Sequence, residues 1–187
     1  MQLKEEQKVL ETRFRRIKMK NYPIQDVSGL LGKHVIYTYE NNWQYEVYFK
    51  NAKNVDYRIH SGPVAGRWVN DRKVSMKSLG NWIFRVNWIE PTGNIVTMCI
   101  NPQKRWLHSY FLMPMWVHKH PERTICHENE FVDDMLKYRD QGPTWPMVPA
   151  EDSFANITFL ENVGVDREDI IDCSPDELPD GYEEREN

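Results

Sequence analysis

Residues 35–49 read VIYTYENNWQYEVYF, in which apolar and polar side chains alternate on either side of an Asn-Asn pair. Before the pair, Val35, Tyr37 and Tyr39 fall on one face of an extended chain, because successive side chains of a strand point to opposite sides. After the pair, Trp43 starts the same alternation again. Adjacent asparagines favour a tight turn. The stretch therefore predicts a β-hairpin with one strongly aromatic face.

The same alternation continues beyond the hairpin and marks further short strands: residues 55–59, 65–69, 74–76, 82–88, 95–100, 106–112 and 154–160. The clearest apolar face is formed by Trp82, Phe84, Val86 and Trp88. Short strands that follow one another about every ten residues are typical of a sandwich or a barrel. Because the aromatic side chains lie on one face, we expect a mainly β protein: a closed antiparallel up-and-down β-barrel around a small ligand.

Two helical segments are expected to flank the strands. Within residues 1–20, four apolar side chains fall roughly on one helical face: Leu3, Leu10, Phe14 and Ile17. We interpret this segment as a helix on the protein surface, with a helix that binds a partner or a membrane surface as the alternative. The second helix is expected to begin after Asn129 as N-cap, to present Met135 on its apolar face and to end at Gly142.

Charge is unevenly distributed along the chain, whose formal net charge is −4. Residues 1–20 carry seven Lys or Arg and three Glu, whereas residues 168–187 carry nine Asp or Glu and one Arg. Both ends are predicted to be solvated rather than part of the core. We expect an N-terminal helical extension over residues 1–30, a β-barrel domain over residues 31–171 and an acidic C-terminal tail over residues 172–187. No basic footprint for nucleic acid stands out.

The three cysteines, Cys99, Cys126 and Cys173, are an odd number without close spacing. They are interpreted as reduced thiols, which favours a cytoplasmic protein. The first residues lack the apolar core of a signal peptide, and no apolar run approaches the length of a membrane span. We therefore expect no membrane partner.

Two ionisable residues break the inside/outside alternation. Glu90 continues the parity of Val86 and Trp88, and Arg67 shares the parity of Val69. An unpaired charge inside a barrel is costly, so each side chain needs a partner or a function. The alternatives are a purely structural salt bridge between them, or a register slip that turns Glu90 to water.

Tyr37 and Tyr39 stand two residues apart, so both hydroxyls project from one face of the strand, about 7 Å apart. Paired phenols can hold a carboxylate or a phenolate. The alternative is two core tyrosines whose hydroxyls find backbone partners.

Four potential metal ligands lie within ten residues of one another: His118, His120, Cys126 and His127. They sit beside Pro121 in an expected loop and lack the spacing of a zinc site. We predict no metal site, with a metal-dependent enzyme that uses these histidines as the alternative.

Five blocks of the sequence resemble the bacterial phenolic acid decarboxylases, also called para-coumaric or ferulic acid decarboxylases. They are GKHVIYTYENNWQYE (residues 32–46), DYRIHSGPVAGRWV (56–69), WIEPTG (88–93), PMWVHKHPE (114–122) and ITFLENVGVD (157–166). The blocks occur in the family's order with similar spacing, and the similarity runs from about Leu31 to about Ile171. It is therefore more specific than any single motif.

This resemblance implies a lipocalin-like barrel, a homodimer and a carboxy-lyase that needs no metal or organic cofactor. It implies that the family's catalytic positions are occupied by the residues singled out above: Tyr37, Tyr39, Arg67 and Glu90. It also implies a set of substrate-binding residues: Trp43, Tyr45, Tyr57, Ile59, Val64, Trp88 and Val96. Pro63 stands where a larger apolar residue is common in the family, which leaves the preference among phenolic acids open.

The implied reaction is non-oxidative decarboxylation of para-hydroxycinnamic acids (p-coumaric, ferulic and caffeic) to 4-vinylphenols and CO₂. Loss of the phenolic proton and protonation of the alkene carbon give a quinone methide, which accepts the electrons as CO₂ leaves. We expect Glu90 to transfer the proton and Arg67 to orient it, while the two tyrosines bind one polar end of the substrate. Desolvation would raise the pKa of Glu90 and Arg67 would lower it, so the net direction stays open. A lipocalin-type carrier of a small aromatic acid is the alternative function.

Overall fold

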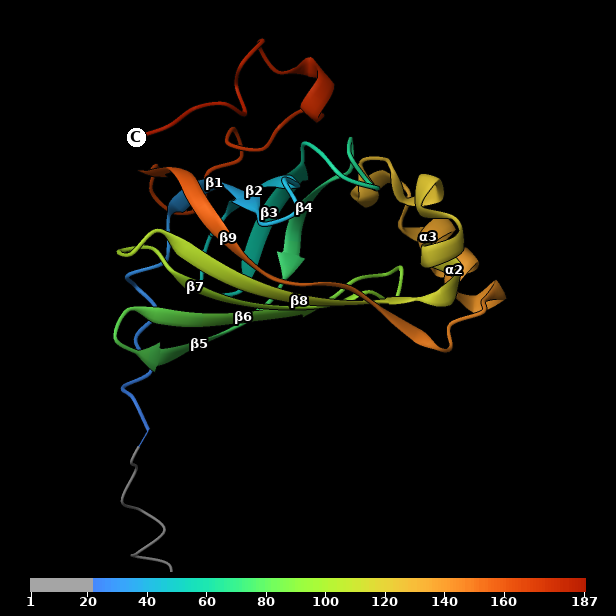
Figure 1. Cartoon of the computed structure of the whole chain (residues 1–187), viewed down its shortest axis with the longest axis horizontal. Coiled ribbons are helices and arrows are strands. Elements are labelled where there is room, and N and C mark those ends of the chain that lie inside the picture. The colour runs from blue at the N-terminus through green and yellow to red at the C-terminus, as the bar shows by residue number, and fades with distance from the viewer. Residues whose placement is uncertain (1–21) are drawn as a thin grey trace, which may run out of the picture.

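The computed structural model describes residues 22–187, and the helix expected within residues 1–20 lies outside them. The described chain forms one antiparallel sheet of nine strands, in the order β4-β3-β2-β1-β9-β8-β7-β6-β5 (Figure 1). The strands are β1 Lys33–Tyr39, β2 Gln44–Tyr48, β3 Asn54–Ile59, β4 Trp68–Lys73, β5 Ser75–Gly80, β6 Ile83–Ile89, β7 Ile95–Asn101, β8 Trp106–Pro114 and β9 Met147–Asn162. The mainly β, up-and-down architecture is confirmed, with β9 joining the two ends of the meander.

The predicted hairpin is present as β1 and β2, with Tyr37 opposite Tyr45. Asn42 occupies the turn at φ 67°, a left-handed conformation that asparagine tolerates better than most residues. The side chain of Asn41 accepts a hydrogen bond of 3.0 Å from the backbone N–H of Trp43, which closes the turn. The register places the aromatic faces of both strands on the same side of the sheet.

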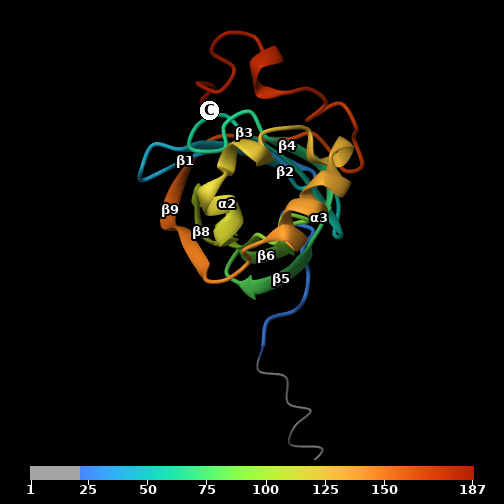
Figure 2. The same ribbon diagram turned by 90° about the vertical axis from the view of Figure 1, so that its right-hand side faces the viewer.

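The sheet curls strongly around its inner face, so that its strands surround a common core (Figure 2). The ladder order is linear, and β4 and β5 are its two edges. Only Val74 separates these strands in the sequence, but the described residues form no ladder between them. A curled half-barrel is therefore observed, and the expected closure of the barrel is not confirmed.

The strand expected from the apolar run of residues 82–88 begins one residue later in the structure, at Ile83. Trp82 lies in the turn between β5 and β6 at φ 60°, and 47% of it is exposed. Its ring covers Gly29, where an added Cβ would come within 2.6 Å of the ring. Both Asn81 and Trp82 take the left-handed conformation, as a two-residue hairpin turn demands, so the turn overrides the apolar pattern. Phe84, Val86 and Trp88 face the core as predicted.

The strand expected over residues 65–69 also begins later, at Trp68. Gly62 and Gly66 precede it with φ values of 102° and 96°, and Ala65 donates its N–H to Gly62 in a turn. An added Cβ at Gly66 would meet Ile125 at 3.0 Å, so this turn is packed against the segment that precedes the helices. The turn directs Arg67 inward before the regular alternation of β4 starts.

Two α-helices cover one end of the curled sheet, α2 (Met115–Lys119) and α3 (Val132–Gln141) (Figures 1 and 2). The first was not predicted. The second was, but Phe131 rather than Asn129 is its N-cap. Asn129 lies instead in the 3-10 helix η2 (Glu128–Glu130), where its side chain exchanges two hydrogen bonds of 2.9 Å with the backbone of Asn70 on β4. A second 3-10 helix, η1 (Pro121–Thr124), connects α2 to this region.

The C-terminal segment, which follows β9, runs back over the outer face of β1, β2 and β3 (Figure 1). Ile171 is fully buried, and the hydroxyl of Tyr182 donates a 2.9 Å hydrogen bond to Glu46 on β2. Glu46 is itself 0% exposed, so it needs such donors on its side of the sheet. The expectation of a wholly solvated end is wrong at these contacts, while the domain boundaries at residues 30 and 171 remain predictions. No helix in residues 22–187 is long and apolar enough to cross a bilayer.

Candidate active site

A pocket opens inside the curl of the sheet and is lined mainly by apolar and aromatic side chains. All seven residues expected to bind substrate contribute to its wall: Trp43, Tyr45, Tyr57, Ile59, Val64, Trp88 and Val96. Three of the four expected catalytic residues line it as well, namely Tyr37, Arg67 and Glu90. The structure thus brings these ten residues from five strands and three loops to one cavity, and their roles remain predictions.

Glu90 directly follows β6 and points into the pocket, on the same side as Trp88. Its side chain therefore points inward, as the alternation along residues 82–90 predicts, and only 7% of the residue is exposed. Its Oε1 atom accepts hydrogen bonds from Tyr57 Oη at 2.6 Å and from Trp88 Nε1 at 3.3 Å. Its Oε2 atom accepts from Arg67 Nη2 at 2.8 Å, from Asn94 Nδ2 at 2.9 Å and from Thr92 Oγ1 at 3.2 Å. Such a set of donors stabilises a carboxylate anion.

Burial and the neighbouring groups shift the pKa of Glu90 in opposite directions. Burial is the largest single influence and raises the pKa of Glu90. The charge of Arg67, the hydrogen bond from Tyr57, the charge of Arg72 and the hydrogen bond from Asn94 act in the other direction. Together they hold the pKa of Glu90 below its ordinary value, so the side chain is an anion at neutral pH.

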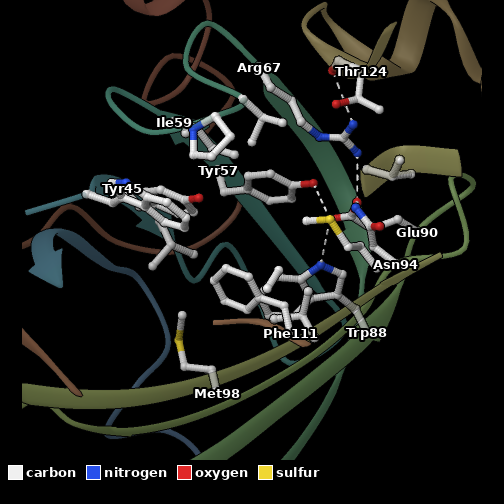
Figure 3. A pocket seen from close by; sticks show the side chains of 18 of the residues that line it. Tyr45, Tyr57, Ile59, Arg67, Trp88, Glu90, Asn94, Met98, Phe111 and Thr124 are labelled. Atoms are coloured by element: carbon white, nitrogen blue, oxygen red, sulfur yellow. Dashed lines mark hydrogen bonds and ion pairs between the residues drawn. The ribbon is translucent and has the colours of Figure 1, made fainter. Parts of the chain in front are cut away.

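Arg67 is 2% exposed and forms the buried ion pair with Glu90 that the sequence left as one alternative. Its Nη1 atom donates to the backbone oxygen of Thr124 in η1 at 3.2 Å. Its Nη2 atom also donates to Glu128, a carboxylate on η2 that is itself 0% exposed. The guanidinium is therefore surrounded by acceptors, and Figure 3 shows how it joins Glu90 to Thr124 at one end of the pocket.

Tyrosines gather at the other end. Ring centroids of Tyr37 and Tyr39 lie 5.4 Å apart, and that of Tyr45 lies 5.4 Å from Tyr39. Burial is the main cause that raises the pKa of all three well above the ordinary value, so they are neutral phenols that can donate hydrogen bonds. Tyr39 does not line the pocket, and its buried hydroxyl has no hydrogen-bond partner among the described residues. A buried hydroxyl of this kind is uncommon in folded proteins and calls for a physical account.

The pocket is therefore asymmetric along its length. The carboxylate and guanidinium of Glu90 and Arg67 stand at one end, and the hydroxyl of Tyr45 faces the cavity from the other (Figure 3). Met98 and Phe111 line the apolar wall between them (Figure 3). A flat aromatic ligand with a polar group at each end matches this arrangement.

The histidines do not form a metal centre. His118 and His120 are exposed, and His127 stacks on Trp68 with ring centroids 3.7 Å apart. Within residues 22–187, no group of three or more His, Cys, Asp or Glu side chains is placed to hold a metal ion.

Several residues of the site were not expected from the sequence. Thr92 and Asn94 belong to the turn after β6, where Gly93 takes φ 92° and donates its N–H to the backbone carbonyl oxygen of Glu90. The Pro-Thr-Gly signal of that turn, two residues from a buried carboxylate, could have pointed to them. Glu128 carries no such signal, because its burial depends on how the loop that contains it packs on β4.

Comparison with known proteins supplies an independent result. A model of the family described as phenolic acid decarboxylase (PAD) matches residues 27–185. Phenolic acid decarboxylase PadC of Bacillus subtilis is 46% identical over 151 residues, which cover 80% of this chain and 92% of that protein. A probable phenolic acid decarboxylase of Vibrio cholerae is 42% identical over 157 residues, covering 84% of this chain and 90% of that protein.

Among solved structures, a putative beta-lactamase from Burkholderia vietnamiensis is similar with a TM-score of 0.44 and 11% identity. The similarity covers 71% of this chain and 97% of that one. At this level it supports no conclusion about fold or function.

Proposed function

The chain belongs to the phenolic acid decarboxylase family, and on that premise we propose that it converts para-hydroxycinnamic acids to 4-vinylphenols and CO₂. As a family member it is a carboxy-lyase that acts on phenolic acids, so the carrier without chemistry is set aside. The finer proposal names p-coumaric, ferulic and caffeic acids as substrates and the pocket as the site of reaction. The observation that carries it is an anionic Glu90 at the end of an aromatic cavity.

The charges of the site support one orientation of the substrate. A substrate carboxylate would be repelled by the anionic Glu90, and Arg67 is already paired with Glu90 and Glu128. Tyr37 and Tyr45 line the cavity, and their hydroxyls are neutral because burial raises their pKa. We therefore place the phenolic hydroxyl of the substrate at Glu90 and its carboxylate among the tyrosines.

In this orientation Glu90 accepts the phenolic proton. A second proton, taken up from solvent, then adds to the alkene carbon next to the carboxylate and gives the quinone methide. The bond from that carbon to the carboxylate breaks, its electrons flow back through the ring to the phenolic oxygen, and CO₂ leaves. Glu90 returns its proton to the phenolate, so the net reaction consumes one proton and needs no redox partner. The low dielectric of the buried pocket strengthens the hydrogen bonds that Glu90 and the tyrosines would make to the substrate.

A homodimer is part of the same proposal. Ile89 on β6 and Ile95 on β7 are paired in register and are 68% and 39% exposed on the outer face of the sheet. Neighbouring apolar side chains of this kind suit contact with a second copy. A cytoplasmic location is also proposed, and the three free cysteines, Cys99, Cys126 and Cys173, agree with a reducing compartment.

The direct test is turnover. Purified protein, treated with a chelator, would be mixed with p-coumaric acid near pH 6, and the product followed by ultraviolet absorbance and mass spectrometry. We expect 4-vinylphenol and CO₂, formed at the same rate as by protein that was not treated with the chelator. The para-methoxy analogue is the matched control: it has no phenolic proton for Glu90 to accept and should bind without reacting. Turnover of that analogue would contradict the quinone methide route.

A further inference from the structure

Among residues 22–187, Glu128 is the one fully buried carboxylate in direct contact with Arg67 that the reaction proposed above does not use. It comes from the 3-10 helix η2, and its side chain is 0% exposed. Its Oε2 atom accepts a hydrogen bond from Arg67, and its Oε1 atom accepts one from Arg72 on β4. A buried carboxylate held between two arginines is costly to desolvate, so its position calls for a physical account.

The four side chains form a chain of alternating charge, in the order Arg72, Glu128, Arg67, Glu90. The link between the two carboxylates is a single atom, Nη2 of Arg67, which donates to Oε2 of Glu90 at 2.8 Å and also to Oε2 of Glu128. An Nη2 group carries two hydrogens, so both are engaged. The remaining Nη1 group donates to Thr124, which leaves the guanidinium anchored from three sides.

We propose that Glu128 is a positioning residue that holds Arg67 against Glu90 and balances its charge, so that Glu90 keeps enough basicity to accept a proton from the substrate. This inference rests on the proposed function and adds the residue through which the strength of the base is set. Without Glu128, the full charge of Arg67 would fall on Glu90 alone and make it a weaker base. The guanidinium would also be free to bind the substrate's own carboxylate at the wrong end of the pocket.

Arg72 has the opposite effect on the pKa of Glu90. It is 15% exposed, more than the other three members, and its charge is one of the influences that lower the pKa of Glu90. Loss of Arg72 should therefore raise the pKa of Glu90, whereas loss of the Glu128 charge should lower it. Other titratable groups beside these four side chains include Tyr57, Cys126 and His127, and Tyr45 interacts electrostatically with both Glu90 and Arg67. The hydroxyl of Tyr57 bonds Glu90, burial raises the pKa of the Cys126 thiol, and His127 stacks on Trp68.

Two substitutions separate positioning from simple structural support. In Glu128→Gln we expect kcat to fall about tenfold or more, and the acid limb of the pH profile to move to lower pH by about half a unit or more. In Arg72→Gln we expect the acid limb to move to higher pH. Cinnamate, which lacks the phenolic hydroxyl, should inhibit Glu128→Gln more strongly than the wild type, because its carboxylate can then pair with Arg67.

Glu130→Gln is the matched control, because Glu130 lies on the same 3-10 helix but is 69% exposed and pairs with His127 at the surface. It should leave the pH profile and kcat unchanged. The pKa of Glu90 can also be measured without substrate by carbon NMR. The signal to follow with pH is the carboxyl carbon resonance that is missing from the spectrum of Glu90→Gln. The absence of vinylphenol from the wild type would then count against the proposed function, while this titration still tests the positioning role.

The proposal is overturned if Glu128→Gln folds and keeps the wild-type pH profile and kcat, or if the two substitutions shift the pKa of Glu90 in the same direction. If Glu128→Gln does not fold, Arg72→Gln is the deciding variant. An unchanged pKa of Glu90 in Arg72→Gln also refutes the proposed electrostatic coupling along the four side chains.

Discussion

The Nη2 atom of Arg67 lies 2.8 Å from Oε2 of Glu90, in an ion pair whose side chains are 2% and 6% exposed. A carboxylate in such surroundings would normally hold its proton, yet the donors around it lower its pKa. These donors keep Glu90 deprotonated at neutral pH, and only the deprotonated carboxylate can accept the proton of a phenol. The pair is thus both a structural element of the site and the origin of its proposed reactivity.

The first prediction concerns Glu90→Gln. The amide keeps the shape of the side chain but cannot accept the phenolic proton, so we expect turnover to fall by at least about 100-fold while p-coumarate still binds. Turnover is measured by vinylphenol release, and binding by quenching of the pocket tryptophan fluorescence. Glu40→Gln, in an exposed position after β1, serves as the control. Near-normal turnover in Glu90→Gln would remove this residue from the mechanism.

Tyr57→Phe tests how the basicity of Glu90 is set. The Tyr57 hydroxyl donates to Glu90 at 2.6 Å and lowers its pKa, so its removal should raise that pKa. Activity requires the anion and is lost as pH falls through the pKa of Glu90. The acid limb of kcat/KM against pH should therefore move to higher pH in the variant, with the same substrate used for both proteins. An acid limb that stays in place or moves to lower pH would show that this hydrogen bond does not lower the pKa of Glu90.

Tyr39→Phe separates stability from activity. The hydroxyl of Tyr39 is buried without a partner, so removing it should leave the melting temperature unchanged or slightly higher. If the substrate carboxylate is the missing partner, kcat/KM should nevertheless fall about 10- to 1,000-fold through the loss of a charge-assisted hydrogen bond. Thermal unfolding and steady-state kinetics on the same samples give both values. Wild-type kinetics would assign Tyr39 to the core alone.

A fourth prediction concerns stability far from the pocket. Asp56 on β3 is 1% exposed, and burial raises its pKa from 3.8 to about 6 despite a backbone hydrogen bond from Asp71 and the charge of Lys50. Between about pH 4 and pH 6 the folded protein therefore binds more protons at this site than the unfolded chain. Its contribution to the free energy of unfolding falls over that window as pH rises, by up to about 3 kcal/mol.

Asp56→Asn should remove that pH dependence, because the amide oxygen can still accept the hydrogen bond from Asp71 while no charge has to be buried. Chemical denaturation of both proteins at pH 5 and pH 8 measures the effect. We expect the wild type to lose more stability than the variant between the two values. Equal losses would mean that Asp56 titrates normally in the folded protein.

The sequence alone determined the local elements and the direction of the inward side chains. The alternation around Asn41 and Asn42 was sufficient for the first hairpin, since a strand has a period of two and a turn needs residues that tolerate a left-handed backbone. The same period placed Glu90 on the inner face, and the resemblance named the family. Trp82 marks the limit of this reasoning, because the geometry of a turn overrode an apolar pattern.

Only the tertiary structure decided which groups meet around the inward charges. Glu90 binds Tyr57 from another strand, Arg67 from a turn and Asn94 from its own loop, and Arg67 in turn binds Glu128, 61 residues away. The net pKa shift of Glu90 is the sum of opposing effects that depend on distances of a few ångströms, which residue types and spacing do not contain. The open edge between β4 and β5 and the cover provided by the C-terminal segment likewise depend on contacts between distant segments, and so follow from the packed chain rather than from its local patterns.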